Sequence, residues 1–276
     1  MCLFAIYLRY TLYLCILLLL PVLLNGQSQK VIYPHSVFWS KTEANQIFEN
    51  KWGVGVDFVY RRKNAFKQGS MFSERLRESI RPWIHYQFSP YARFSLSPLG
   101  YMYTHEYLAN PEDAARLPYH EVRTTFQFFH HLKQLDGRIM HTWRYRYELR
   151  WQEQQNSEDY RFLNRFRFRY RIRYLFNTND FYEDGLWYAA ISNEIGLNFG
   201  KSVVLNTFNQ NRLYIGVGHR FLNAVRAELR YVNRIRTRGS TGFEMDYGTG
   251  IMIGLYIDQI SKISTSKDIP AVRFYD

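Results

Sequence analysis

The amino-acid sequence predicts an all-β fold: a transmembrane antiparallel β-barrel of about 10 strands (range 8–12) with an arginine-rich lumen. Two observations lead to this prediction. Segments with alternating apolar and polar residues recur along the chain, and the connections between them are alternately short and long. In the clearest segment, RFRFRYRIRY at 165–174, arginine takes every odd position. Successive side chains of a strand point to opposite faces, so all five guanidinium groups share one face.

The N-terminus predicts export from the cytoplasm. Arg9 precedes the leucine-rich run YTLYLCILLLLPVLL, and small residues follow near Gly26. This order of regions indicates a secretory signal peptide over residues 1–26. A retained membrane anchor is the alternative, although the run is short for a spanning helix. Both cysteines, Cys2 and Cys15, fall in this leader, so the exported chain has none for a disulfide, a metal site or a nucleophile.

Five further segments alternate in the same way as the arginine segment, and each is expected to form a strand. They are WGVGVDFVYR (52–61), RLRESIRPWIHYQF (75–88), HEVRTTFQFF (120–129), RIMHTWRYRYELRW (138–151) and FEMDYGTGIMIGLYID (243–258). In each segment one set is mostly aromatic or aliphatic, and the opposite set contains most of the polar and charged residues. The pattern therefore predicts a sheet with one apolar face and one charged face.

The spacing of turn residues predicts the topology. Short turns are expected at 89–92, 133–137 and 221–223, with a longer one at 177–185, and long connections at 62–72, 106–118, 152–159, 198–208 and 237–242. Short turns at one rim and long loops at the other are typical of membrane barrels. Counting from Trp52 to Ile257 gives ten strands with both ends on the short-turn side. We assign 27–50 to an N-terminal segment, 51–258 to the barrel and 259–276 to a polar tail.

The alternation also indicates which face meets which environment. In a membrane barrel the apolar face meets lipid and the charged face lines a wet lumen. A soluble lipocalin-like ligand-binding barrel is the alternative, and it would reverse the faces. A nucleic-acid surface would place arginines and stacking aromatics on the same face, and export also argues against it despite the net charge of +12.

Two prolines predict an irregularity in the sheet. Pro82 and Pro98 flank the turn at 89–92 and should lie nearly opposite each other. Each lacks a backbone donor, so a bulge is expected there, with Tyr101 and Tyr103 turning outward beyond Pro98.

Counting across the turns predicts a network of charges in the lumen. Glu194 should face Arg212 and lie beside Arg167 or Arg169, and Glu148 should approach Arg165 and Arg146. The acids are expected to neutralise part of the arginine charge. The full expected set is Glu121, Arg144, Arg146, Glu148, Arg165, Arg167, Arg169, Arg171, Glu194, Arg212, Glu228 and Glu244.

The order and spacing of several segments resemble an uncharacterised bacterial family, catalogued as domain of unknown function 2490 and expected to form outer-membrane β-barrels. The segments are KWGVGVDFVYR, LGYMY at 99–103, the arginine-alternating strands, NEIGLNF and NQNRLYIGVGHRF, and the resemblance covers roughly residues 35–257. It implies an outer-membrane location and no established activity. The polar tail departs from the many barrels that end on an aromatic residue.

No catalytic motif is visible in the sequence. The histidines are scattered, no serine motif accompanies them, and neither a metal site nor a cofactor is expected. Two functions remain: a largely structural barrel with a charge-filled lumen, and an anion-binding or anion-selective small channel. The expected partners are outer-membrane lipid, anionic solutes or lipid phosphate, and the barrel-assembly machinery during insertion.

The face assignment can be tested with single cysteines, because the exported chain has none of its own. We expect a lipid-phase thiol reagent to label cysteine at 166 and 168 and to spare 167 and 169, since Phe166 and Phe168 should face lipid. Stronger labelling at 167 and 169 would favour the soluble alternative.

Overall fold

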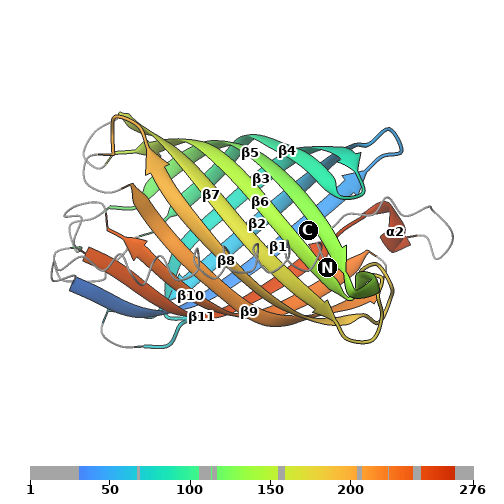
Figure 1. Cartoon of the computed structure of the whole chain (residues 1–276). Coiled ribbons are helices and arrows are strands. Elements are labelled where there is room, and N and C mark those ends of the chain that lie inside the picture. Colours follow the sequence, from blue (N-terminus) through green and yellow to red (C-terminus); the bar gives the residue numbers. More distant parts are fainter. Residues whose placement is uncertain are drawn as a thin grey trace, which may run out of the picture. The chain divides into compact units, whose positions relative to one another are not determined.

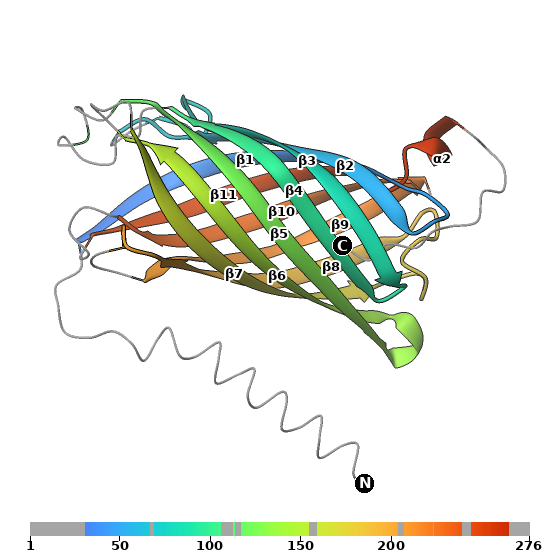
Figure 2. The same ribbon diagram turned by 90° about the horizontal axis from the view of Figure 1, so that it is seen from above.

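The computed structural model describes residues 31–66, 69–105, 113, 117–154, 159–203, 207–222, 224–238 and 244–264. The expected leader at 1–26 and the last part of the expected tail, 265–276, lie outside these residues. The described residues contain eleven strands that close into a barrel (Figures 1 and 2), which confirms the predicted all-β barrel, with a strand number inside the predicted range. None of the helices in this part of the chain has the length and hydropathy needed to cross a membrane.

Each strand pairs with its neighbours in sequence, and these ten pairings are antiparallel. The strands are β1 (Val31–Ile47), β2 (Trp52–Lys63), β3 (Glu74–Ser89), β4 (Ala92–Thr104), β5 (Tyr119–Gln134), β6 (Ile139–Glu153), β7 (Tyr160–Leu175), β8 (Trp187–Phe199), β9 (Phe208–Leu222), β10 (Val225–Thr237) and β11 (Glu244–Ile257). A short 3-10 turn, η2 (Leu135–Gly137), joins β5 to β6, and a single helical turn, α2 (Ser261–Ser264), follows β11.

The connections alternate between short and long, as the turn residues predicted, except that the link between β7 and β8 is also long. The links after β1, β3, β5, β7 and β9 are at one rim, where α2 also lies (Figure 2). The links after β2, β4, β6, β8 and β10 are at the other rim. We call these the short-turn rim and the loop rim. The ten strands expected between Trp52 and Ile257 are β2 to β11.

The eleventh strand, β1, corrects the expected domain limits. Residues 31–47 were placed in a separate N-terminal segment, but they form a barrel strand that pairs with β2 over Val37–Ile47. The outward side chains of this strand include Ser40, Thr42, Ala44 and Gln46. They lack the aromatic alternation of the other strands, so the period-two signal was weak here.

An odd number of strands makes the closing pair parallel. Ten antiparallel steps lead from β1 to β11, so these two neighbours run in the same direction. A Cβ atom on Gly250 would lie 1.7 Å from the backbone oxygen of Val37, and one on Gly248 would lie 2.8 Å from the ring of His35. Two residues further along β11, from Gly248 to Gly250, the contact on β1 also moves two residues forward, from His35 to Val37. This is the order that a parallel register requires. Glycine at position 250 therefore allows the two backbones to approach closely.

Residues after β11 extend the closure. The side chain of Gln259 bonds the backbone of Ile47 twice: it accepts from the Ile47 N–H (3.1 Å) and donates to the Ile47 oxygen (2.7 Å). The Ile260 N–H donates to the oxygen of Asn45 (3.0 Å). The start of the expected tail is therefore attached to the end of β1 and joins the first and last strands.

The parallel closure also corrects the expected position of the chain ends. With ten strands both ends would lie at the short-turn rim. With β1 included, the barrel chain begins at the loop rim and ends at the short-turn rim.

The predicted bulge near the two prolines is confirmed. The β3–β4 register shifts between Ile80 and Ile84, and the β4–β5 register shifts between Ser97 and Gly100. Ser95 and Ser97 are buried before this point, and Met102 and Thr104 are buried after it. Tyr101 turns outward with 43% of its surface exposed.

The parallel closing pair of β1 and β11, which we call the parallel seam, predicts a specific effect of a larger side chain. Gly250→Val should prevent close pairing of β1 with β11 and lower the thermal stability of the barrel in detergent, because the new side chain meets the backbone at Val37. Thr249→Val, the outward neighbour on the same strand, is the control and should leave stability nearly unchanged. Equal stability of the two variants would contradict the parallel seam. Heat-modifiable gel mobility and thermal unfolding would measure the stability of each variant.

Candidate functional site in the barrel lumen

The charged faces of the strands converge on the barrel interior. Among the described residues, seventeen lysine and arginine side chains are buried against eight aspartate and glutamate side chains. The five arginines of β7 illustrate the arrangement: Arg165, Arg167, Arg171 and Arg173 are at most 5% exposed, while the aromatic residues between them lie on the outer face. The interior is thus filled by charges with an excess of positive groups.

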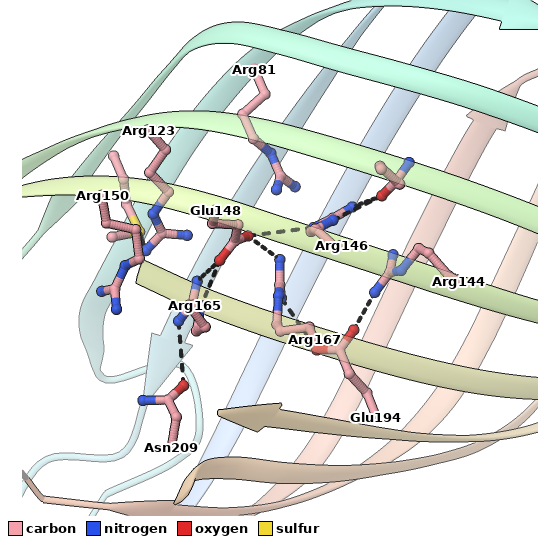
Figure 3. A network of polar contacts seen from close by, with 12 residues as sticks. Arg81, Arg123, Arg144, Arg146, Glu148, Arg150, Arg165, Arg167, Glu194 and Asn209 are labelled. Atoms are coloured by element: carbon pink, nitrogen blue, oxygen red, sulfur yellow. Dashed lines mark hydrogen bonds and ion pairs between the residues drawn. The ribbon is translucent and has the colours of Figure 1, made fainter. Parts of the chain in front are cut away.

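Two glutamates organise the centre of this network (Figure 3). Glu194 on β8 binds Arg144, Arg167 (3.2 Å) and Arg212 (3.2 Å), which come from three different strands. Arg212 is its directly paired residue on β9. The sequence predicted the contacts of Glu194 with Arg167 and Arg212.

Glu148 on β6 has the second set of contacts. It binds Arg165, its paired residue on β7, and also Arg167, while Arg146 lies 3.9 Å away. Arg146 is held more closely by Gln127, whose side-chain oxygen accepts from its Nε (2.8 Å). Arg167 therefore links the two glutamates and makes one connected network.

Glu121 and Glu228 anchor further groups towards the two rims. Arg150 donates to both oxygens of Glu121 (2.6 and 2.9 Å), and Arg123 binds the same carboxylate. Glu228 accepts from Tyr188 (2.5 Å) and binds Arg226 (3.0 Å), Arg230 and Arg171 (3.5 Å).

Two residues of the expected set differ from the rest. Arg169 faces the lumen opposite Glu194 in the register, yet it makes no ion pair with any described carboxylate. Glu244 lies at the loop rim, where it binds Arg238 (3.0 Å), a residue outside the expected set. The other ten residues of the set belong to the network of the lumen.

An aromatic plug at the short-turn rim was missed from the sequence. The connection between β7 and β8 was expected to be a longer turn, but Phe181 and Tyr182 fold into the lumen beside Tyr188. Phe181 is fully buried, and the guanidinium groups of Arg173, Arg220 and Arg226 lie 4.9–5.6 Å from its ring centre. The only available signal was the pair of aromatic residues inside an otherwise polar turn.

Trp39 on β1 is a second buried aromatic residue that contacts guanidinium groups, in the half of the barrel nearer the loop rim. It is 1% exposed and packs with Val37, Tyr214, Val232 and Met252. The guanidinium groups of Arg61, Arg212 and Arg234 lie over its ring at 4.4–5.7 Å. Such cation–π contacts partly offset the desolvation of a buried guanidinium. This residue was missed because β1 itself was missed.

Two cavities that lie between described side chains of the lumen have volumes of about 20 and 40 Å³. A water molecule needs at least ~10–15 Å³ by the same kind of measure, so each of these cavities holds only a few waters. The side chains that line them therefore leave little free space at these two places.

The histidines do not form a site with one another. His131 is buried and bonds Thr142 (3.2 Å), whereas His130 lies on the outer face beside Trp143. The described residues contain no group of three or more histidine, cysteine, aspartate or glutamate side chains placed to hold a metal ion.

The network predicts an asymmetry between acid and base substitutions. Glu194→Gln should destabilise the barrel by about 3–5 kcal/mol, because three buried guanidinium groups lose the same carboxylate. Arg212→Gln should be milder, since Arg144 and Arg167 still neutralise Glu194. Thermal unfolding in detergent compares the two. A neutral glutamate change with a costly arginine change would show that the acids do not organise the lumen.

Comparison with known proteins identifies the family of the chain. A family model described as Protein of unknown function (DUF2490) matches residues 37–243, which is more than half of the chain and runs from β1 to the last loop before β11. A search of curated proteins finds no match. The chain belongs to the DUF2490 family, as the resemblance in its strands indicated.

Proposed function

We propose that this protein is an outer-membrane β-barrel that spans the bilayer with its strands and whose lumen is closed to free diffusion. The observation that carries the proposal is the distribution of side chains between the two faces. Every strand from β2 to β11 exposes large apolar residues on its outer face, while the described carboxylates and guanidinium groups are concentrated inside. A soluble barrel of the lipocalin type would have the reverse arrangement.

The outer face is too apolar for a protein surrounded by water. Its central part includes Val54, Phe126, Ile191, Ile215 and Ile253, each between 37% and 49% exposed. Soluble monomers rarely expose continuous apolar surface on this scale. In a bilayer the same side chains meet lipid tails, and the closed hydrogen-bonded ladder leaves no strand edge in the hydrocarbon.

The length of the strands suits a membrane. They contain 12 to 17 residues, whereas crossing the hydrocarbon core takes about 9–11 residues in a tilted strand. The extra length places strand ends in the interfacial regions. There the outer face carries aromatic groups such as Trp187 stacked on His219 at one rim, and Tyr101 and Tyr103 with His120 at the other, as expected for interfacial belts.

The packed lumen favours a structural barrel over an open channel. The aromatic plug and the ion-pair network occupy the described interior, and the two cavities described above hold a few waters each. Such a barrel would hold its long loops at one membrane surface on a rigid support.

The proposal predicts three results for the full-length protein. It should fractionate with the outer membrane, it should migrate faster on a gel before boiling than after, and it should give no stable conductance steps in planar bilayers. An open porin measured in the same bilayers is the control for detection. Recovery in the soluble fraction would overturn the membrane location, and stable ohmic steps would overturn the closed lumen alone.

A further inference from the structure

One of the described cavities of the lumen, with a volume of about 40 Å³, has an unusual lining. Seven of its lining residues are arginines, and none is a carboxylate. It lies in the loop-side half, because Arg61, Arg77, Arg165 and Arg212 are all within a few residues of the loop ends of their strands. We call it the arginine cavity. We propose that the arginine cavity is a binding site for a small inorganic oxyanion such as phosphate or sulfate.

Two of the lining arginines have no carboxylate partner among the described residues. Arg61 has its guanidinium over the ring of Trp39, 4.4 Å from the centroid, and makes no ion pair. Arg77 donates to the hydroxyl oxygens of Thr104 (2.9 Å) and Tyr119 (3.3 Å), which are both neutral. Both charges are therefore available to a bound anion.

The ion-paired arginines Arg167 and Arg212 also have N–H donors that are not used in hydrogen bonds. Arg167 and Arg212 use their terminal nitrogens for Glu148, Glu194 and Gln210. Their Nε atoms, and that of Arg61, are buried and have no hydrogen-bond partner among the described residues. A guanidinium presents five N–H donors in a planar fork that matches the oxygens of phosphate or sulfate. Unused donors at the wall of a cavity are what such an anion needs.

The charge balance of the interior points the same way. The buried described residues carry nine more positive than negative groups. Like charges in a poorly solvated interior repel strongly, and a buried charge without a partner is costly. An anion in the arginine cavity would neutralise part of this excess where no lining carboxylate does so. Figure 3 shows Arg81, Arg123 and Arg167 projecting into this part of the lumen from β3, β5 and β7.

The backbone at the bulge shapes the cavity. The register shift after Ser97 brings Gly100 to the inner face, where it lines the arginine cavity. A Cβ on Gly100 would lie 2.7 Å from Cγ of Arg81. Glycine therefore leaves room for the Arg81 side chain, which continues to Asp57 (2.9 Å). Gly100, which the register shift turns inward, therefore helps to shape this wall.

Size and lining restrict the ligand. The volume of about 40 Å³ suits a few waters or one small anion and leaves no room for the glycerol and acyl chains of a lipid phosphate. The smaller cavity, of about 20 Å³, is less suitable because Asp57 and Glu43 are in its lining. The proposal concerns the interior alone, so it does not depend on membrane location.

The test uses the purified full-length protein in detergent, in a chloride buffer without oxyanions. Sodium phosphate or sulfate should raise the thermal unfolding temperature in a saturable way, beyond the effect of sodium chloride at equal ionic strength. Equilibrium dialysis with labelled phosphate should approach one anion per barrel. No shift beyond that of chloride, or an unsaturable shift with no bound phosphate, would overturn the proposal. Such a failure would leave the fractionation result untouched.

Two methionine variants locate the site. Arg61→Met removes an unpaired charge, so it should leave stability without phosphate unchanged or higher and weaken phosphate binding at least tenfold. Arg169→Met is the matched control: Arg169 is also without an ion pair, but it lines the smaller cavity. It should keep the phosphate response. Loss of binding in Arg169→Met but not in Arg61→Met would place the anion elsewhere.

Arg77→Met provides a second variant of the same cavity. If Arg61→Met does not fold, because Trp39 loses the nearest of its three guanidinium groups, the comparison with Arg169→Met rests on Arg77→Met. A normal phosphate affinity in a folded Arg77→Met or Arg61→Met would overturn the assignment to this cavity.

Discussion

Pairing between a few carboxylates and many guanidinium groups is the interaction on which the interior of this barrel depends. Glu148, Glu194 and Glu228 each contact arginines from more than one strand. The contacts between different strands are possible only in the observed register, because a slip by one residue would turn the whole charged set outward. The ion pairs therefore specify how the strands align, in addition to any stability that they contribute. Buried pairs are uncertain as sources of net stability, but they can give specificity to a fold.

Aromatic rings provide a second kind of partner for the buried guanidinium groups. Phe181 at the short-turn rim and Trp39 in the loop-side half each receive three guanidinium groups on or near their rings. The negative face of an aromatic ring attracts a cation without adding a formal charge. The interior thus contains both ion pairs and cation–π stacks, and the arginine cavity lies where the carboxylates are absent from the lining.

Much of this arrangement follows from local sequence pattern, and the remainder depends on long-range contacts. Alternation in β7 predicted which of its residues face the lumen. Counting across turns predicted that Glu194 meets Arg212, because strands that are neighbours in sequence pair with each other and the turn length fixes their register. The same reasoning could not find β1, whose outward residues Ser40, Thr42 and Ala44 lack the apolar signal. It also could not predict that Phe181 enters the lumen, since a turn has no period and its direction is set by the rings and cations that it meets.

The parallel seam between β1 and β11 separates the two ends of the barrel chain. Strand β1 begins at the loop rim with Val31, and strand β11 ends at the short-turn rim with Ile257. In a barrel closed by antiparallel strands the ends are adjacent, and a short peptide can join them. Here a circularly permuted chain would need a linker that runs the height of the barrel, on the order of 40 Å or a dozen extended residues. Such a linker would have to run along either the apolar outer surface or the lumen, so circular permutation should be tolerated poorly by this fold.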